Sequence, residues 1–294
     1  MKTLINNLKK VMALVIVFSF CSCSTNDDLS NASTSTNSSL KTSSDKFNVF
    51  KGPEVQYLNG KARSWISINK EGFPLELAIE FTPDVLVDLP IPTDGEMVMP
   101  ENNILPGTLV EDGATVLPLH SKAKEVTPFE HIGLNFQPMG HDPGFNVPHF
   151  DLHFYAITLE ERLAIPTYDQ NNQDIVDAFN LFPDPTKMPN DYVKPPLIQA
   201  SYPNMGKHWL PISWFIGSNT FTHIMVYGSY AQKNTFTEPM ITVDYLLSGE
   251  EFSGTYSQPL TFEEPGNNYP TKYNIYHDEL NGNIYITLSD FVTR

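Results

Sequence analysis

The Asn281-Gly282 dipeptide near the C-terminus constrains the fold of this chain more than any other short segment. Asn-Gly readily supplies two consecutive residues with positive φ, which a type I′ turn between antiparallel strands requires. The flanking segments, 273–280 and 283–288, contain the tyrosine, isoleucine and threonine that are frequent in strands. The sequence therefore predicts a β-hairpin here, and with it an antiparallel sheet.

Strand patterns recur along much of the chain, and helical patterns are few. Segments 61–69 and 75–82 alternate in character around the turn Lys70-Glu71-Gly72. Three further segments are rich in β-branched or aromatic residues: 150–157, 220–227 and 235–247.

Two short helices are predicted, at 159–164 and at 174–181. Thr158 and Glu161 have the spacing of a capping box before the first of them. Because strand–helix–strand alternation does not run through the sequence, we expect a mainly β fold. It would be an antiparallel β-barrel or sandwich with small helical insertions.

The N-terminal residues 1–22 have the parts of a bacterial lipoprotein signal peptide. Lysines precede an apolar run at 11–20, and Phe20-Cys21-Ser22-Cys23 resembles a lipobox in which Cys23 is lipidated. The alternative is an ordinary cleaved secretory peptide with no acyl chain. The first interpretation predicts a lipid anchor in the membrane of the bacterial cell envelope, on the periplasmic or surface face of the outer membrane.

Behind Cys23, residues 23–46 form a Ser/Thr/Asn-rich stretch with little apolar content, which predicts a flexible tether. Residues 47–294 are expected to form a single β-rich domain. No cysteine follows Cys23, so a disulfide within this domain is excluded. The formal net charge of −16, from 18 Lys and Arg against 34 Asp and Glu, argues against nucleic acid as a partner.

Histidines gather in the segment 140–155, which reads GHDPGFNVPHFDLHFY. On a strand, His149, Asp151, His153 and Tyr155 share one face, and apolar side chains share the other. Imidazole and carboxylate groups are ligands for transition metals. However, His149 and His153 would be roughly 13 Å apart on a straight strand, so either Asp151 joins one histidine or the strand bulges. A helix with Pro148 at its first position would also put His149 and His153 on one face, and it is the less favoured alternative.

Other strands and loops offer further ligands. His208 lies beside Trp209, which could close over a pocket, His223 lies in a strand-like segment, and Glu238 opens another. We predict that His149, His153, His208 and His223, with Glu238 or Asp151, surround one polar pocket and bind one divalent transition metal, Zn, Fe or Mn. His141 could turn toward this pocket or toward solvent. We assign no role to His120, His131 and His277.

Four motifs, read in order, resemble one domain family: GHDPxxxxPHFDxHFY, MGKHW, FTHxxxYGSY and EPMIT. They are similar to secreted bacterial domains of unknown function typified by a Thermus protein under an extracytoplasmic sigma factor. The resemblance covers roughly residues 53–247. It implies a β-rich envelope domain that can form a homo-oligomer, and it supplies no activity.

Two functions remain open from the sequence. The first is a metal-binding envelope lipoprotein that acts on a small molecule of unknown identity through a metal-bound water or a general base. The second is a non-catalytic oligomeric or ligand-binding stress module whose histidine cluster is a structural hydrogen-bond network. The sequence contains none of the GxSxG, phosphate-loop or HExxH motifs of well-known enzyme classes.

Overall fold

The computed structural model describes residues 47–91, 113–142, 144–194, 201–217 and 220–294. All of them belong to one unit that spans residues 39–294. The predicted signal peptide, Cys23 and the whole tether therefore lie outside the described residues. Within these ranges, every helix is too short or too polar to cross a membrane.

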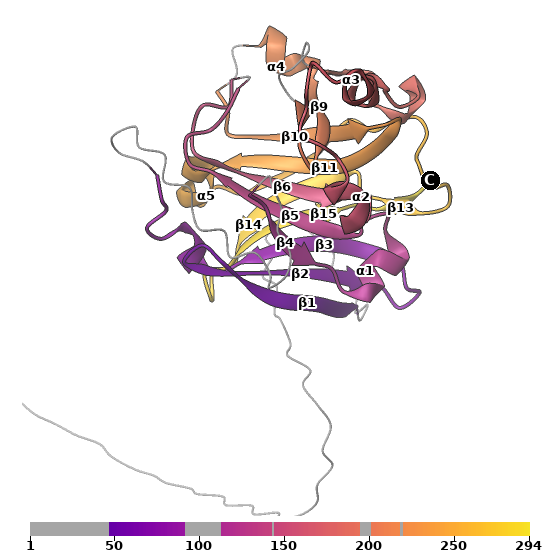
Figure 1. Ribbon diagram of the computed structural model, residues 1–294. Coiled ribbons are helices and arrows are strands. Elements are labelled where there is room, and N and C mark those ends of the chain that lie inside the picture. The colour runs from indigo at the N-terminus through magenta and orange to yellow at the C-terminus, as the bar shows by residue number, and fades with distance from the viewer. Residues whose placement is uncertain (1–46, 92–112, 143, 195–200, 218–219) are drawn as a thin grey trace, which may run out of the picture. The chain divides into compact units, whose positions relative to one another are not determined.

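The described residues form two antiparallel sheets (Figure 1). The six-stranded sheet consists, in spatial order, of β1 (Asn48–Tyr57), β2 (Gly60–Ile68), β3 (Pro74–Phe81), β15 (Ile284–Ser289), β14 (Lys272–His277) and β12 (Phe252–Thr255). The eight-stranded sheet has the order β4 (Thr115–Pro118), β5 (His131–Gln137), β6 (His149–Tyr155), β11 (Lys233–Thr242), β10 (His223–Tyr230), β9 (Gly206–Pro211) and β7 (Tyr192–Val193), with β8 (Ser201–Tyr202) also paired to β9. A small third sheet pairs β13 (Asn268–Tyr269) with β16 (Val292–Thr293).

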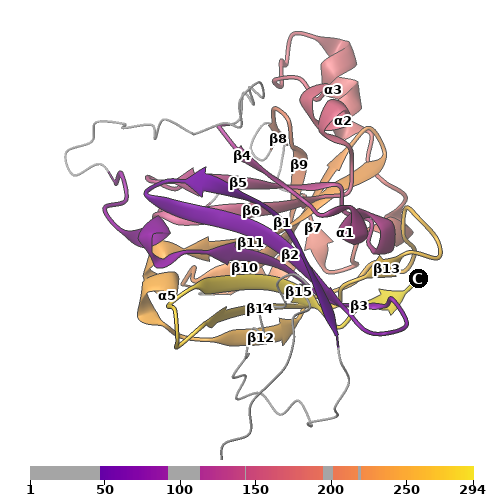
Figure 2. The ribbon, with the colours of Figure 1, turned by 90° about the horizontal axis from the view of Figure 1, so that it is seen from below.

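The two large sheets enclose one hydrophobic core, which makes the fold a β-sandwich. The aromatic rings of Tyr57 and Phe81, from the six-stranded sheet, lie 6.3 and 5.9 Å from the ring of Phe150 on β6. Figure 2 shows strands of the six-stranded sheet lying over β5, β6 and β11 of the eight-stranded sheet. The prediction of a mainly β, antiparallel fold is confirmed, as a sandwich.

Within the described part of the chain, five short helices join the strands: α1 (Ser121–Val126), α2 (Leu159–Leu163), α3 (Gln173–Asn180), α4 (Ile212–Ile216) and α5 (Val243–Ser248). Two 3-10 turns lie at Pro83–Leu86 and Pro185–Lys187. The helices expected at 159–164 and 174–181 correspond to α2 and α3, and the predicted capping box between Thr158 and Glu161 is present.

Two local predictions were wrong. The segment 235–247 is not one strand, because the Thr242 hydroxyl accepts a hydrogen bond from the Tyr245 amide and starts α5, which ends at the left-handed Gly249. The C-terminal hairpin exists, but its connection runs over residues 278–283 rather than through a two-residue turn. In that loop Asp278 and Asn281 accept hydrogen bonds from backbone amides two residues on, so side chains shape a longer loop.

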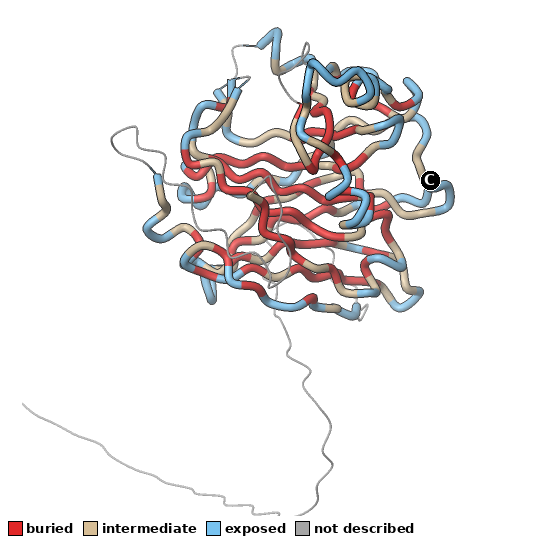
Figure 3. The backbone as a smooth tube through the Cα atoms, in the orientation of Figure 1, coloured by how far each residue is buried: buried red, intermediate tan, exposed pale blue. Residues whose placement is uncertain are grey.

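The outer face of the eight-stranded sheet is covered around β6. All seven residues of β6 are buried, although four of them point away from the sandwich core. Figure 3 shows β5, β6 and β11 buried over most of their length. Apolar residues of α3, of the segments on either side of α2 and of neighbouring loops pack against this outer face near Tyr155 and Phe236. The polar side chains of β6 are therefore buried between the sheet and its covering segments.

Candidate metal centre

The segment from His149 to Tyr155 is a strand, as its alternation predicted. Phe150, Leu152 and Phe154 face the sandwich core. The polar side chains point to the outer face, where the structure divides the candidate ligands between two neighbouring groups. We call His141, His149 and Asp151 the first triad, and His153, His208 and Glu238 the second triad.

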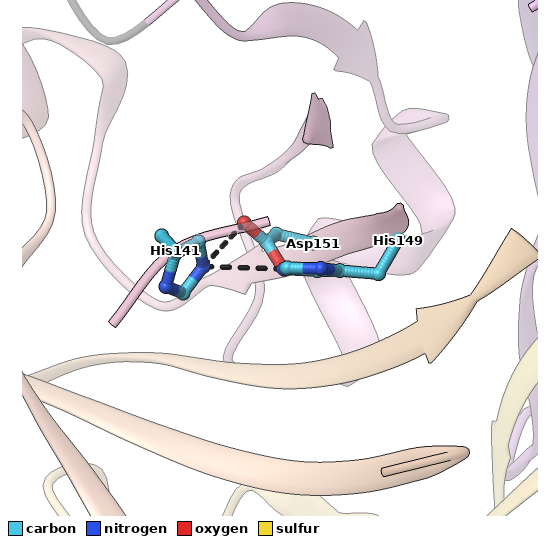
Figure 4. A group of neighbouring side chains, drawn as sticks. All are labelled: His141, His149 and Asp151. Atoms are coloured by element: carbon cyan, nitrogen blue, oxygen red, sulfur yellow. Dashed lines mark hydrogen bonds and ion pairs between the residues drawn. The ribbon is translucent and has the colours of Figure 1, made fainter. Parts of the chain in front are cut away.

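The three side chains of the first triad meet at short distances (Figure 4). The Nε2 atoms of His141 and His149 lie 3.2 Å apart. The Asp151 carboxylate places Oδ1 3.0 Å from His149 Nε2 and Oδ2 3.4 Å from His141 Nε2. Asp151 thus joins His149 on the strand, as one of the two predicted arrangements required.

A tight turn brings His141 to this position. His141 and Phe145 form a backbone bridge in both directions, with N···O distances of 3.1 and 3.0 Å. Gly140 before it has φ +67°, and a Cβ atom there would lie 2.1 Å from the Phe145 carbonyl oxygen. Only glycine fits at this position. His141 therefore turns inward, the first of its two predicted alternatives, and its side chain keeps 25% of its surface exposed.

Aromatic rings cover the first triad. Phe145 stacks on Trp214 with ring centroids 4.5 Å apart and meets Phe221 edge to face at 4.9 Å. Phe221 also packs edge to face against His149 at 5.2 Å. These rings fix the imidazole of His149 and exclude water from that side.

Backbone carbonyls determine which ring nitrogens of the first triad carry hydrogen. His149 Nδ1 lies 2.7 Å from the Val147 carbonyl oxygen, and His141 Nδ1 lies 2.9 Å from the Asp142 carbonyl oxygen. A carbonyl only accepts, so both Nδ1 atoms must be donors. In the neutral imidazoles, both Nε2 atoms therefore carry lone pairs, and these lone pairs point at each other and at a carboxylate. Metal-ligating histidines commonly donate the hydrogen of their other ring nitrogen to a carbonyl in this way.

The second triad comes entirely from strands. The registers Thr237↔Phe154 and Met240↔Asp151 set Glu238 opposite His153 on neighbouring strands. His208 on β9 is aligned with Gly228 on β10. Glu238 Oε1 lies 3.4 Å from His153 Nε2, and Oε2 lies 3.5 Å from His208 Nε2.

Burial and charge shift the ionisation of both carboxyl groups, in opposite directions. Burial alone would raise the pKa of Asp151, but the neighbouring imidazoles of His149 and His141, which stabilise the carboxylate when they are protonated, outweigh burial and hold the pKa well below the usual range. Burial, together with the charge of Asp151, raises the pKa of Glu238 well above its ordinary value. Burial also holds the pKa of His153 well below its ordinary value. The surroundings therefore favour the charged form of Asp151 and the neutral form of Glu238.

His223, which we predicted as a ligand, lies apart from both triads. It pairs with Ile241, a core residue, so its side chain points to the inner face of the sheet. There its Nδ1 lies 2.8 Å from the Tyr273 hydroxyl, and its ring packs against Phe252. The single pocket expected from the sequence is thus replaced by two triads on the outer face, without His223.

Trp209 also differs from its predicted role. Its indole donates a hydrogen bond to the Ser229 hydroxyl, 2.8 Å away, and its ring meets Phe182. The aromatic residue beside His208 is instead Tyr202, whose ring centroid lies 5.0 Å from that of His208.

Sequence reasoning missed two residues of this centre. Gln137 Nε2 donates a hydrogen bond of 2.9 Å to Asp151 Oδ2. The Tyr202 ring lies near His141 as well as His208, and its hydroxyl donates to the Asp142 carbonyl. Burial, with nearby carboxylates, raises the pKa of Tyr202 to about 12. The alternation of His131, Gly133, Asn135 and Gln137 along β5 was a signal for Gln137, whereas no local pattern marks Tyr202.

Two histidines and one carboxylate are a donor set that suits Zn, Fe or Mn. Three protein ligands leave one position of a tetrahedral ion for water or a small molecule, and a bound metal ion acidifies such a water. This composition, rather than an oxygen-only shell, distinguishes both triads from calcium or magnesium sites.

Comparisons with known proteins identify no relative. No family model, no curated protein and no solved structure matches this chain.

Proposed function

We propose that the protein is a cell-envelope lipoprotein whose β-sandwich domain binds one divalent transition metal ion, Zn, Fe or Mn, at the first triad. One observation carries this proposal. Both imidazoles donate their Nδ1 hydrogens to backbone carbonyls, and both therefore direct a lone pair toward one point beside the Asp151 carboxylate. A shared cation satisfies three acceptors that would otherwise face one another in a buried site.

The distances support the same conclusion. Ligand atoms about 2.1 Å from one ion lie about 3.0 Å apart at right angles and about 3.4 Å apart at the tetrahedral angle. The three separations within the first triad are 3.0, 3.2 and 3.4 Å. The Asp151 carboxylate turns one oxygen toward each ring, so little movement of the side chains is needed for both Nε2 atoms and this carboxylate to contact one ion.

A hydrogen-bond network is the alternative function of this triad, and one observation favours it. Burial lowers the pKa of His141, but the Asp151 carboxylate and the Asp142 carbonyl outweigh burial and raise it above its ordinary value. A doubly protonated His141 paired with Asp151 would close the triad without an ion, as in a non-catalytic envelope module.

Elemental analysis of tag-free full-length protein decides between these two functions. We expect bound transition metal in the wild type and one equivalent less in Asp151→Asn, because the amide is a far weaker ligand than the carboxylate. His223→Gln is the matched control, since it changes a histidine on the inner face and should keep the metal. Protein without metal, whose stability does not change in chelator, would leave the hydrogen-bond network as the function.

The envelope location is tested separately. The lipobox-like sequence at Cys23 and the polar stretch behind it support a lipid anchor. We expect Cys23→Ser to release the protein from the membrane fraction. Unchanged membrane association of this variant would contradict the anchor.

A further inference from the structure

We propose that the second triad, His153, His208 and Glu238, binds a second divalent transition metal ion, so that the outer face of the eight-stranded sheet holds two separate ions. This inference rests on the proposed function, because it assigns the same class of ion to a neighbouring site with the same donor types.

The second triad has the spacing of metal ligands rather than of hydrogen-bond partners. Glu238 faces His153 Nε2 at 3.4 Å and His208 Nε2 at 3.5 Å, one carboxylate oxygen toward each ring. Good N–H···O hydrogen bonds are 2.7–3.2 Å long. Two ligand atoms at the tetrahedral angle around one ion are about 3.4 Å apart. An ion among the three side chains therefore fits the observed separations.

Buried polar atoms of this triad are left without hydrogen bonds. His153 is fully buried and Glu238 is 1% exposed. Neither ring nitrogen of His153, nor Oε2 of Glu238, makes a hydrogen bond with any described residue. Burying such groups without compensation is costly. A metal ion would coordinate His153 and Glu238 at once.

Ring packing holds His153 in place for this role. The ring of Phe236 meets that of His153 edge to face at 4.7 Å, and Tyr155 stacks on the other side at 5.4 Å. Phe236 can lie there because Gly228 has no side chain: a Cβ atom at Gly228 would lie 2.1 Å from the Phe236 ring. The sheet is thus shaped to present His153 toward Glu238 and His208.

Strand geometry keeps the two ions apart. Asp151 of the first triad and His153 of the second are neighbours on one face of β6, about 7 Å apart along the strand. Ions that share a bridging ligand are about 4 Å apart. We therefore infer two mononuclear sites, with Tyr202 between His141 and His208 as the side chain near both.

Titration of chelator-stripped, tag-free full-length protein with Co(II) tests the second site. We expect two equivalents bound by the wild type, one by Asp151→Asn and one by Glu238→Gln. We also expect the visible spectra of the two variants to add up to that of the wild type, because the ions do not share a ligand. His223→Gln, the control, should bind two equivalents.

The outcomes separate the two proposals. One equivalent in the wild type that Glu238→Gln leaves in place would overturn the second site and keep the first. No bound Co(II) in the wild type would overturn both. If Glu238→Gln does not fold, as judged by circular dichroism, His208→Gln replaces it, since His208 is the most exposed of the three ligands. The same single-equivalent result is then expected, and two equivalents would overturn the assignment.

Discussion

The two triads have the same donor types but are held in different ways. In the first triad, hydrogen bonds orient the ligands: two backbone carbonyls fix the histidines and Gln137 fixes Asp151. One of its ligands, His141, comes from a turn and is a quarter exposed. In the second triad all ligands come from β6, β9 and β11, and ring packing orients His153. An accessible site and an enclosed site can therefore share one strand, β6.

This comparison leads to an expected difference in exchange. The side chain of His141 is a quarter exposed, so solvent reaches one ligand of the first triad, whereas His153 and Glu238 of the second triad are buried among strands. We therefore expect fast exchange at the first triad and slow exchange at the second.

Metal removal should have the largest effect. An ion at a thousandfold excess over its Kd stabilises the folded state by about 4 kcal/mol. We expect chelation to lower the free energy of unfolding by about this amount for each ion, in two kinetic phases. Denaturant unfolding after different times in chelator measures it. A single fast phase would contradict the difference between the sites, and a chelator-insensitive midpoint would contradict both.

Truncating one histidine of each triad should destabilise the metal-free protein by different amounts. His153→Ala leaves a cavity among Phe236 and Tyr155 and should cost about 2–4 kcal/mol. His141→Ala removes a partly exposed side chain from a turn and should cost about 1 kcal/mol or less. Urea unfolding in chelator measures both. Equal costs would show that the two sites are equally enclosed.

The metal affinity of the first triad, but not that of the second, should depend on Gln137. Loss of a hydrogen bond to a ligating carboxylate typically weakens metal affinity 10–100-fold. We expect Gln137→Leu to weaken Co(II) binding at the first triad by this factor and to leave the second unchanged, as chelator competition can measure. A loss at both triads would indicate that the variant disturbs the sheet.

Lowering the pH should reveal a smaller contribution to folding stability, which comes from His131 and not from either triad. Burial, aided by the charges of Arg162 and Lys124, lowers the pKa of His131 from 6.5 to about 3. Because the folded-state pKa is the lower one, the neutral ring stabilises the fold above pH 6.5, and this stabilisation is lost as the pH falls toward 3.

His131→Phe removes this titration while keeping a ring against Tyr155. Relative to the variant, the wild type should lose about 1–2 kcal/mol between pH 7 and pH 5. Chelator present throughout keeps metal release out of the comparison. Parallel stability curves for the two proteins would mean that His131 does not carry this sensitivity.

How far the sequence predicts the centre depends on whether a feature is local. Alternation within one strand predicts that His149, Asp151 and His153 share a face. The spacing of two residues, Thr158 and Glu161, predicts the capping box of α2. The side to which His223 points depends on its pairing with Ile241, which no local pattern reveals. The same holds for the division into two triads, because His208 and Glu238 reach the centre through strand pairing. Tyr202 arrives on a short strand beside β9.

Anomalous X-ray scattering can show directly whether the outer face of the eight-stranded sheet binds transition-metal ions. Crystals of tag-free full-length protein grown with Zn(II) would be measured on both sides of the zinc absorption edge. We predict one anomalous peak among His141 Nε2, His149 Nε2 and Asp151, and a second among His153, His208 and Glu238. Well-ordered side chains with no anomalous peak at either triad would show that this face does not bind the metal.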